Sequence, residues 1–346
     1  MVDSRRAPVS ALETVTDARP MLALLYTITG LNIAITGSSQ GIGLSAAKQL
    51  LSEGHTVYHA CRSEERAEVA RSESGGGIPM VCDLADLDSV RKFAADLKRS
   101  APTLDVLCMN AAVAPSTKAT TPKRTAQGFE EAIGTNHLGH FLLSSLLVDH
   151  LSECGGAGRL VVTSSSVHDP DQPGGAVGGK GGATLGDLSG FGATALNGPT
   201  MADGALEYDG SKVYKDSKLC NVLFCREAVK RWGGKVKIRS FSPGFIPSSG
   251  LFREPRNDNW LGATAFTFFA GLAGFAVPID VGGERLAYLA TASDAQVPQG
   301  SYLSGPTGSK GFTREDGFTD GIFSKEGLDD AKAAKLWERS CEIVGV

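Results

Sequence analysis

The sequence lacks the features that mark nucleic-acid-binding, disulfide-rich and membrane-spanning proteins. Its formal net charge is −4 and it has no basic cluster, which argues against a nucleic-acid partner. The seven cysteines show no paired spacing, and their odd number indicates reduced thiols in an intracellular compartment. The apolar run that begins at Met21 is too short to span a membrane. Cysteines and histidines also lack metal-ligand spacing, so no metal site is predicted.

The composition is that of a globular protein with a large core. The chain has 346 residues, of which 42% are hydrophobic and 21% are charged. This length allows one large α/β domain or two ordinary ones. Residues 1–30 mix acids with arginines, whereas a transit peptide is poor in acids. We therefore interpret residues 1–30 as an N-terminal extension, with the remnant of a processed leader as one interpretation, and residues 31–346 as the folded domain.

A nucleotide-binding unit is predicted near the start of this domain. The apolar run 31–36 ends at a glycine loop, and apolar residues at helical spacing follow until Gly54. Such glycines let the backbone approach a pyrophosphate, and the helix N-terminus offers free N–H groups. The spacing Gly-x-x-x-Gly-x-Gly differs from the commoner Gly-x-Gly-x-x-Gly. The predicted cofactor-binding residues of this unit are Gly37, Ser39, Gln40, Gly41, Ile42 and Gly43.

Arg62 indicates which dinucleotide binds. The strand predicted at 55–60 is followed by Cys61 and Arg62, where folds that prefer NAD usually carry an acid for the ribose 2′-hydroxyl. A guanidinium suits a 2′-phosphate instead. The alternative is a solvated arginine that opens the next helix. We expect NADPH.

Strands and helices alternate along the rest of the chain. Further strands are predicted at 80–84, 104–109, 160–163, 236–241 and 301–304, with a terminal helix at 328–343. This alternation predicts a doubly wound, Rossmann-type parallel sheet in a single α/β domain. Ligands of such sheets bind at the carboxyl ends of the strands. The further cofactor-binding residues expected there are Asp83, Leu84, Asn110, Ala111, Ala112, Pro243 and Gly244.

Three segments stand out from this alternation. A helical pattern at 129–151 carries Asn136, a polar residue amid apolar neighbours, for which a satisfied surface amide is the alternative to a functional role. His137 and His140 on it are expected to be packing or helix-surface residues. A glycine-rich insertion is predicted at 168–210. The aromatic segment 251–277 fits either a lid over an apolar ligand or a packed helix.

Tyr214 and Lys218 are a candidate proton-transfer pair. They lie at i and i+4, so on a helix they share one face. An ammonium beside a phenol stabilises its ionised form and makes it a better acid or base near neutral pH. By itself the spacing is also common on solvated helix faces; the glycine loop upstream makes the functional interpretation stronger.

Taken in order, these motifs resemble the short-chain dehydrogenase/reductase superfamily. The resemblance implies that the tyrosine delivers a proton, and that the lysine lowers the tyrosine pKa and holds the nicotinamide ribose. It also implies that Asn136 orders a proton-relay water and that a serine orients the substrate. Ser165 is assigned that role, with Ser164 and Ser166 as alternatives.

A narrower resemblance covers most of the chain and is to the light-dependent protochlorophyllide reductase family. It is carried by Ala60-Cys-Arg62, Asn110-Ala-Ala-Val113, Asn136-His-Leu-Gly-His-Phe-Leu142, Leu185-Gly-Asp-Leu188, the segment from Asp209 to Asn221 and Gly250-Leu-Phe-Arg-Glu254. It implies NADPH, a tetrapyrrole pigment as small-molecule substrate, and a plastid or cyanobacterial setting. The implied reaction is light-driven reduction of a C17–C18 double bond by a hydride and a proton.

Two positions expected at the substrate pocket depart from that family. Phe245 replaces a cysteine, and a phenylalanine is larger and cannot donate a proton; Ala114 replaces a tyrosine. One alternative is therefore a light-independent reductase of a lipophilic carbonyl or alcohol, similar to retinol dehydrogenases. Another is a non-catalytic pigment- or NADPH-binding protein. The sequence leaves open peripheral membrane association and a homo-oligomer.

Overall fold

The sheet is parallel in seven of its eight strands. The computed structural model describes residues 30–154, 158–176, 182–194, 198–252, 275–306 and 308–346. Within them the strand order is β3-β2-β1-β4-β5-β6-β7-β8, and only β8 runs antiparallel to its neighbour. The bounds are β1 Asn32–Thr36, β2 Thr56–Cys61, β3 Ile78–Val81, β4 Val106–Met109, β5 Arg159–Thr163, β6 Lys237–Ser242, β7 Tyr302–Ser304 and β8 Thr319–Asp320.

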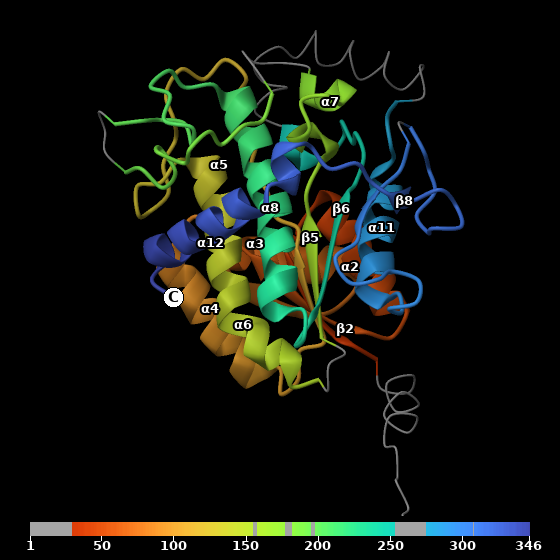
Figure 1. Ribbon diagram of the computed structural model, residues 1–346. Coiled ribbons are helices and arrows are strands. Elements are labelled where there is room, and N and C mark those ends of the chain that lie inside the picture. The colour runs from red at the N-terminus through yellow and green to blue at the C-terminus, as the bar shows by residue number, and fades with distance from the viewer. Residues whose placement is uncertain (1–29, 155–157, 177–181, 195–197, 253–274, 307) are drawn as a thin grey trace, which may run out of the picture.

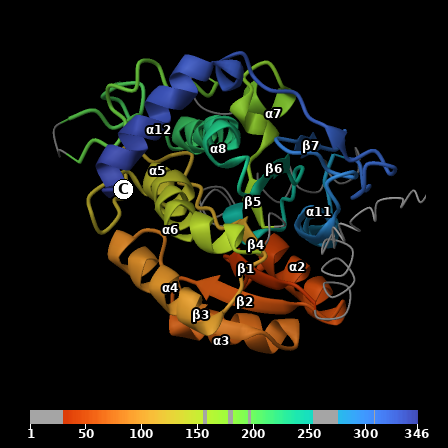
Figure 2. The ribbon, with the colours of Figure 1, turned by 60° about the horizontal axis from the view of Figure 1, so that its bottom comes forward.

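Helices cover both faces of this sheet (Figures 1 and 2). On one face α4, α6, α8 and α12 share a core with alternate strand residues such as Ala34 and Leu107. On the other face α2 and α11 pack on residues such as Ile33 and Ile35. The helix bounds are α2 Gly41–Ser52, α3 Glu64–Ser74, α4 Leu87–Ser100, α5 Glu131–Ile133, α6 His140–Ser152, α7 Pro173–Ala176, α8 Gly210–Trp232, α11 Ile279–Thr291 and α12 Asp330–Val344.

The predicted fold is confirmed, with local corrections. The strand expected at 80–84 ends at Val81, so Asp83 and Leu84 lie in the following loop. The helix expected at 129–151 is interrupted by a π-helix at Gly134–Gly139, between α5 and α6. Sequence patterns missed α11 and the two-residue strand β8. The N-terminal extension and most of the aromatic segment lie outside the described residues.

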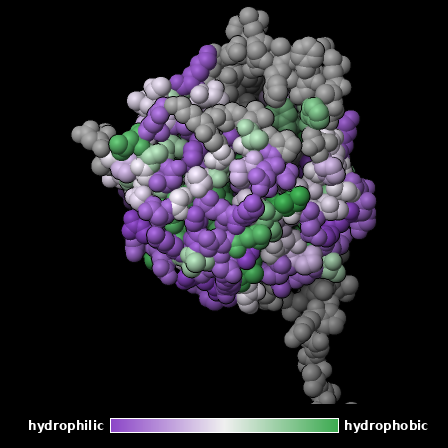
Figure 3. Space-filling view, turned by 45° about the horizontal axis from the view of Figure 1, so that its top comes forward, coloured by the Kyte–Doolittle hydropathy of each residue, from purple (hydrophilic) through white to green (hydrophobic). Residues whose placement is uncertain are grey.

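The glycine-rich insertion lies over the carboxyl ends of the strands, beside the start of α8 (Figure 1). Seen from that side, the described surface is mostly hydrophilic with a few scattered hydrophobic residues (Figure 3). Within the described parts of the chain, no helix is both long and apolar enough to cross a membrane.

Candidate active site

The glycine loop between β1 and α2 is shaped by its three glycines. Gly37 and Gly41 have φ of +69° and +59°, a region that favours glycine. A Cβ on Gly43 would lie 2.5 Å from the carbonyl oxygen of Gly37, whereas a Cβ on Gly41 would meet nothing closer than 4.0 Å. Gln40 occupies the N-cap of α2 without a capping side-chain bond. The loop therefore leaves an open approach to uncapped helix N–H groups, which fits a pyrophosphate.

Thr36 ties this loop to the end of β4. Its hydroxyl accepts hydrogen bonds from the backbone N–H groups of Asn110 and Ala111, at 2.9 and 3.0 Å. The Asn110 side-chain amide in turn donates to the carbonyl of Thr36 at 3.0 Å. The structure thus brings together the predicted residues around Gly37 and those of the segment Asn110 to Ala112.

Arg62 lies beside the same loop. It follows directly on Cys61, whose sulfur is 3.7 Å from the hydroxyl of Ser38. Arg62 is exposed and precedes Ser63, the N-cap of α3. Within the described residues its guanidinium makes no ion pair or hydrogen bond. An exposed guanidinium directly after Cys61, which contacts the loop, fits a 2′-phosphate.

Asp83 lies in the loop after β3. Its carboxylate accepts a hydrogen bond from the backbone N–H of Ala85 at 3.0 Å, which leaves its other oxygen without a partner among the described residues. The neighbouring Leu84 packs its backbone against Gly139, where a Cβ would lie 2.4 Å from the Leu84 carbonyl oxygen. Both predicted residues therefore lie at the carboxyl edge of the sheet, between β3 and the π-helix.

Tyr214 and Lys218 share one face of α8, as the spacing predicts. The Lys218 ammonium lies 5.7 Å from the centre of the Tyr214 ring and donates to the carbonyl of Thr163, at the end of β5, at 3.1 Å. Lys218 is buried, and the Tyr214 hydroxyl makes no hydrogen bond within the described residues. The phenol is therefore available to a ligand.

The pKa values of this pair correct one expectation. Burial raises the pKa of Tyr214 well above its usual value, whereas the spacing with Lys218 predicts stabilisation of the phenolate. Burial lowers the pKa of Lys218 to about 8. At neutral pH the tyrosine is thus protonated and the lysine is charged, a state that can donate a proton rather than accept one.

Asn136 is buried in the π-helix, so the alternative of a surface amide is wrong. Its side-chain carbonyl accepts from the N–H of Val113 at 2.8 Å, and its amide donates to the Val113 carbonyl at 2.9 Å. The amide also donates to the hydroxyl of Ser217, which donates to the carbonyl of Tyr214 at 2.7 Å. A π-helix is frequent at functional sites, and this one links β4, Asn136 and α8.

His140 is a site residue that the sequence did not reveal. It is fully buried, and burial lowers its pKa to about 4, so the ring is neutral. Its Nδ1 lies 3.1 Å from the carbonyl oxygen of Asn136, and its Nε2 lies 2.9 Å from the hydroxyl of Thr36. A carbonyl can only accept, so Nδ1 carries the proton and Nε2 accepts from Thr36. His140 therefore connects the glycine loop to the π-helix, and no local sequence signal indicates this.

The three serines after β5 differ in their bonding. Ser164 is buried and donates to the carbonyl of Lys218 at 3.1 Å, so its hydroxyl is occupied by α8. Ser165 accepts from the N–H of Val167 at 3.4 Å, as N-cap of the short 3-10 helix that follows. The hydroxyl of Ser166 makes no hydrogen bond within the described residues. Ser165 and Ser166 are thus the two hydroxyls that remain for a substrate.

Arg285 stabilises the turn after β6 by hydrogen bonds. The sequence patterns did not identify it as a site residue. This buried guanidinium donates to the carbonyl of Pro243 at 2.9 Å and to two carbonyls of the loop that follows β7. Gly244 has a φ of +90°, and a Cβ there would lie 2.8 Å from the side chain of Val277. Phe245, half-buried, accepts from the N–H of Val277 through its carbonyl. Arg285 thereby fixes the turn that presents Phe245.

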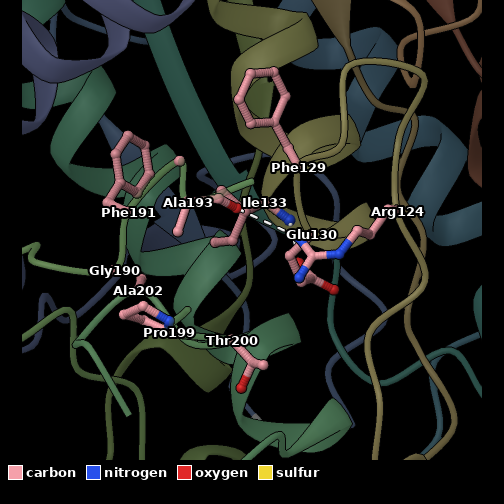
Figure 4. Close-up of a pocket in the computed structure, with 11 residues that line it drawn as sticks. Arg124, Phe129, Glu130, Ile133, Gly190, Phe191, Ala193, Pro199, Thr200 and Ala202 are labelled. Carbon is pink, nitrogen blue, oxygen red and sulfur yellow. Dashed lines mark hydrogen bonds between the residues drawn. The ribbon is translucent and has the colours of Figure 1, made fainter. Parts of the chain in front are cut away.

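Ala114 lies in the loop after β4. It follows Val113, whose backbone is bonded to Asn136, and it is half-buried. A separate pocket lies between residues 124–133 and the insertion (Figure 4). It encloses only about 10 Å³, room for about one water, so it offers no second ligand site.

Comparisons with known proteins agree with this geometry. A family model described as short chain dehydrogenase matches residues 31–177. The chloroplastic protochlorophyllide reductase of Pisum sativum is 40% identical over 91% of this chain and 78% of its own length. Protochlorophyllide reductase A of Arabidopsis thaliana is 38% identical over 99% of this chain and 83% of its own length.

Solved structures share the fold. An uncharacterised protein from Mycobacterium paratuberculosis superposes with a TM-score of 0.64 and 24% identity, over 92% of this chain and 95% of its own. A 3-ketoacyl-(acyl-carrier-protein) reductase from Brucella melitensis, complexed with NADH, gives a TM-score of 0.56 at 17% identity, over 80% of this chain and 96% of its own. The sequence identities to the two plant reductases show the family as well as the fold. The chain belongs to the protochlorophyllide reductase family of short-chain dehydrogenases, oxidoreductases that act on small molecules with a nicotinamide cofactor.

Proposed function

We propose that this protein is an NADPH-dependent, light-driven reductase of protochlorophyllide that reduces its C17–C18 double bond in chlorophyll biosynthesis. The observation that carries the proposal is the Lys218 ammonium 5.7 Å from the centre of the Tyr214 ring, with a Tyr214 hydroxyl that has no hydrogen-bond partner among the described residues. Relatives named as chloroplastic support a plastid location. We further propose that residues 31–346 form the NADP-binding domain, preceded by an extension at 1–30.

The cofactor site is proposed from residues that fit it. The loop Gly37 to Gly43 would hold the pyrophosphate, Arg62 the 2′-phosphate, and Asp83 the adenine. Lys218 would hold the nicotinamide ribose, close to the turn at Pro243 and Gly244. The remaining contacts are assigned to Ser39, Gln40, Ile42, Leu84, Asn110, Ala111, Ala112 and Tyr214.

The proton is proposed to come from Tyr214. When bound, the nicotinamide supplies the hydride. Because burial favours the neutral phenol, Tyr214 holds its proton until an acceptor carbon lies within reach. The Lys218 ammonium then stabilises the tyrosinate that remains, and Asn136 orders the water that returns a proton.

Substrate orientation is proposed for the hydroxyls after β5. Ser165 remains the predicted residue, and its bond to Val167 at 3.4 Å is long enough to give way to a substrate. Ser166 is the alternative, because its hydroxyl has no other partner in the described structure. Ser164 is a less suitable residue, since it is bonded to the backbone of α8.

A flash experiment tests the proposal. Purified protein, NADPH and protochlorophyllide are mixed in darkness, and absorbance is followed before and after a flash. We expect a red shift of the pigment band only after the flash, because chemistry at the double bond requires the excited pigment. Pigment binding without any red shift would contradict the proposal.

A phenylalanine at position 245, where the family has a cysteine, favours a second candidate function. This candidate is a light-independent reductase of a lipophilic carbonyl. Tyr214, Lys218 and a serine suffice for that chemistry, and Phe245 would then only shape the pocket. We expect the variant Phe245→Cys to increase the yield per flash, because a thiol can donate a proton and leaves more space. NADPH oxidation in darkness with a carbonyl substrate would instead support the second candidate.

Arg62 is expected to set the cofactor preference. Replacing it by glutamate should weaken NADPH binding about tenfold to a hundredfold and leave NADH binding nearly unchanged, because one charge-assisted contact to the 2′-phosphate is replaced by repulsion. The measurement is titration of each cofactor by fluorescence. Arg66→Glu, half-buried four residues further along, is the matched control. Equal losses for NADPH and NADH would show that Arg62 is only a solvated residue.

A further inference from the structure

The peptide that joins Ser165 to Ser166 is bound at both of its polar groups. Its carbonyl oxygen, on Ser165, lies 2.7 Å from Nδ1 of His168 and also accepts from the backbone N–H of His168 at 3.2 Å. Its N–H, on Ser166, donates to the hydroxyl oxygen of Ser242 at 3.1 Å. A peptide unit is planar, so fixing both groups fixes the backbone on either side of it. The directions of the Ser165 and Ser166 side chains depend on that backbone.

His168 is fully buried and connects this peptide to a distant part of the chain. A carbonyl can only accept, so Nδ1 carries the proton and Nε2 accepts from the N–H of Ser324 at 3.3 Å. Burial lowers the pKa of His168, which favours this neutral form of the ring. The ring also packs edge-on against the ring of Tyr302 on β7, with the two centres 5.4 Å apart. These contacts fix the orientation of the ring.

The Ser324 end of this connection is fixed as well. The buried Ser324 hydroxyl accepts from the N–H of Gly327 at 3.0 Å, which closes the turn at the 3-10 helix Glu326–Leu328. A Cβ on Gly327 would lie 3.1 Å from the side chain of Val222 on α8 and 3.7 Å from Cδ2 of His168. His168 therefore lies between the serines and a turn that packs on α8.

Ser242 binds the serine segment where the backbone bonds between β5 and β6 give way to a side chain. Just beyond β5, the N–H of Ser164 donates to the backbone carbonyl of Phe241 at 2.8 Å. Two residues on, the N–H of Ser166 bonds the side chain of Ser242 instead. Ser242 ends β6 and directly precedes Pro243, the first residue of the turn assigned to the cofactor. The serine segment and that turn are thus fixed relative to each other.

Packing alone does not account for a histidine at position 168. An apolar side chain of similar size would fill the same space without the cost of removing a polar ring from water. It could not donate to the Ser165 carbonyl and accept from the Ser324 N–H at the same time. The position of a serine hydroxyl matters for the reaction, because a displacement of about 1 Å can lower a rate about a hundredfold.

We propose that His168 and Ser242 are positioning residues that fix the peptide between Ser165 and Ser166, and with it the directions of the two hydroxyls that serve the substrate. We call this pair the serine clamp. It acts through the serines and does not itself contact the substrate. The role rests on the proposed function in one respect, namely that Ser165 or Ser166 orients the substrate.

The first test measures the peptide itself. In Ser242→Ala we expect amide hydrogen exchange at Ser166 to become about tenfold faster, because the N–H loses its partner. Ser240→Ala is the matched control, since its hydroxyl lies two residues earlier on β6 and donates to the carbonyl of Ser301. Exchange at Ser166 should not change in that control. Unchanged exchange in Ser242→Ala would overturn the serine clamp.

The second test measures turnover. His168→Ala should lower the yield per flash about tenfold to a hundredfold, with NADPH affinity close to wild type. His168→Gln should recover part of the yield, because its amide carries a donor and an acceptor, as the neutral ring does. His150→Ala is the control, a buried histidine whose Nε2 lies 2.8 Å from the carbonyl oxygen of Ala101. Full yield in His168→Ala would overturn the role of His168.

A double-mutant cycle separates positioning from a general loss of stability. Ser165→Ala and Ser166→Ala show which hydroxyl serves the substrate. That substitution should cost much less yield in the His168→Ala background than in the wild type, because the hydroxyl is already displaced. Equal losses in both backgrounds, or no loss from either serine substitution, would overturn the role in turnover. If the wild type shows no red shift after the flash, the proposed function fails, while exchange at Ser166 still decides whether the clamp exists.

Discussion

Replacing Tyr214 by phenylalanine is expected to lower turnover about 10²–10⁴-fold, the usual contribution of a positioned proton donor. The change removes only the hydroxyl, which makes no hydrogen bond within the described residues. The ring stays, and with it the contact to the Lys218 ammonium at 5.7 Å. Folding, NADPH binding and pigment binding should therefore stay close to wild type.

Single-flash yield measures turnover, cofactor titration measures NADPH binding, and thermal melting measures folding. Tyr288→Phe is the matched control, because its hydroxyl also has no hydrogen-bond partner among the described residues but lies on α11. In the wild type, turnover should decline as pH rises through about 8, since Lys218 then loses the charge that stabilises the tyrosinate. A Tyr214→Phe variant with full flash yield would assign the proton to another group.

Gly43→Ala is expected to weaken cofactor binding and to destabilise the fold. Its new Cβ would lie 2.5 Å from the Gly37 carbonyl, 2.7 Å from the Asn110 amide nitrogen and 3.0 Å from the Ser38 Cα. Two of these atoms belong to the backbone of the loop itself, so the loop must move. Overpacking of this kind costs about 1–3 kcal/mol, and a displaced loop should weaken NADPH binding about tenfold or more.

Gly234→Ala is the control, because a Cβ there would meet nothing within 4 Å and the position lies far from the loop in the turn after α8. The thermal midpoint and NADPH titration of both variants are compared side by side. Gly43→Ala with wild-type affinity would mean that the loop does not carry the pyrophosphate.

The parts of the site that lie within one element were predictable from the sequence. Gly37 to Gly43 and the pair Tyr214 and Lys218 depend on local spacing, and the structure places them as expected. The strand predicted at 80–84 was too long at its end: β3 ends at Val81, although Cys82 and Leu84 after it are buried like strand residues. The pKa of Tyr214 was predicted in the wrong direction, because burial raises it.

Contacts between distant segments were not predictable. His140 joins Thr36 to Asn136, Arg285 binds the carbonyl of Pro243, and Asp216 binds Thr184. Each contact depends on which strand ends and loops the strand order of the sheet brings together. Hydrophobic periodicity does not predict that strand order. The sequence by itself determined the α/β class, the glycine loop and the Tyr–Lys pair, because local spacing sets them. Only the tertiary structure decided how these parts are locked together, because buried polar groups find their partners across the sheet rather than along the chain.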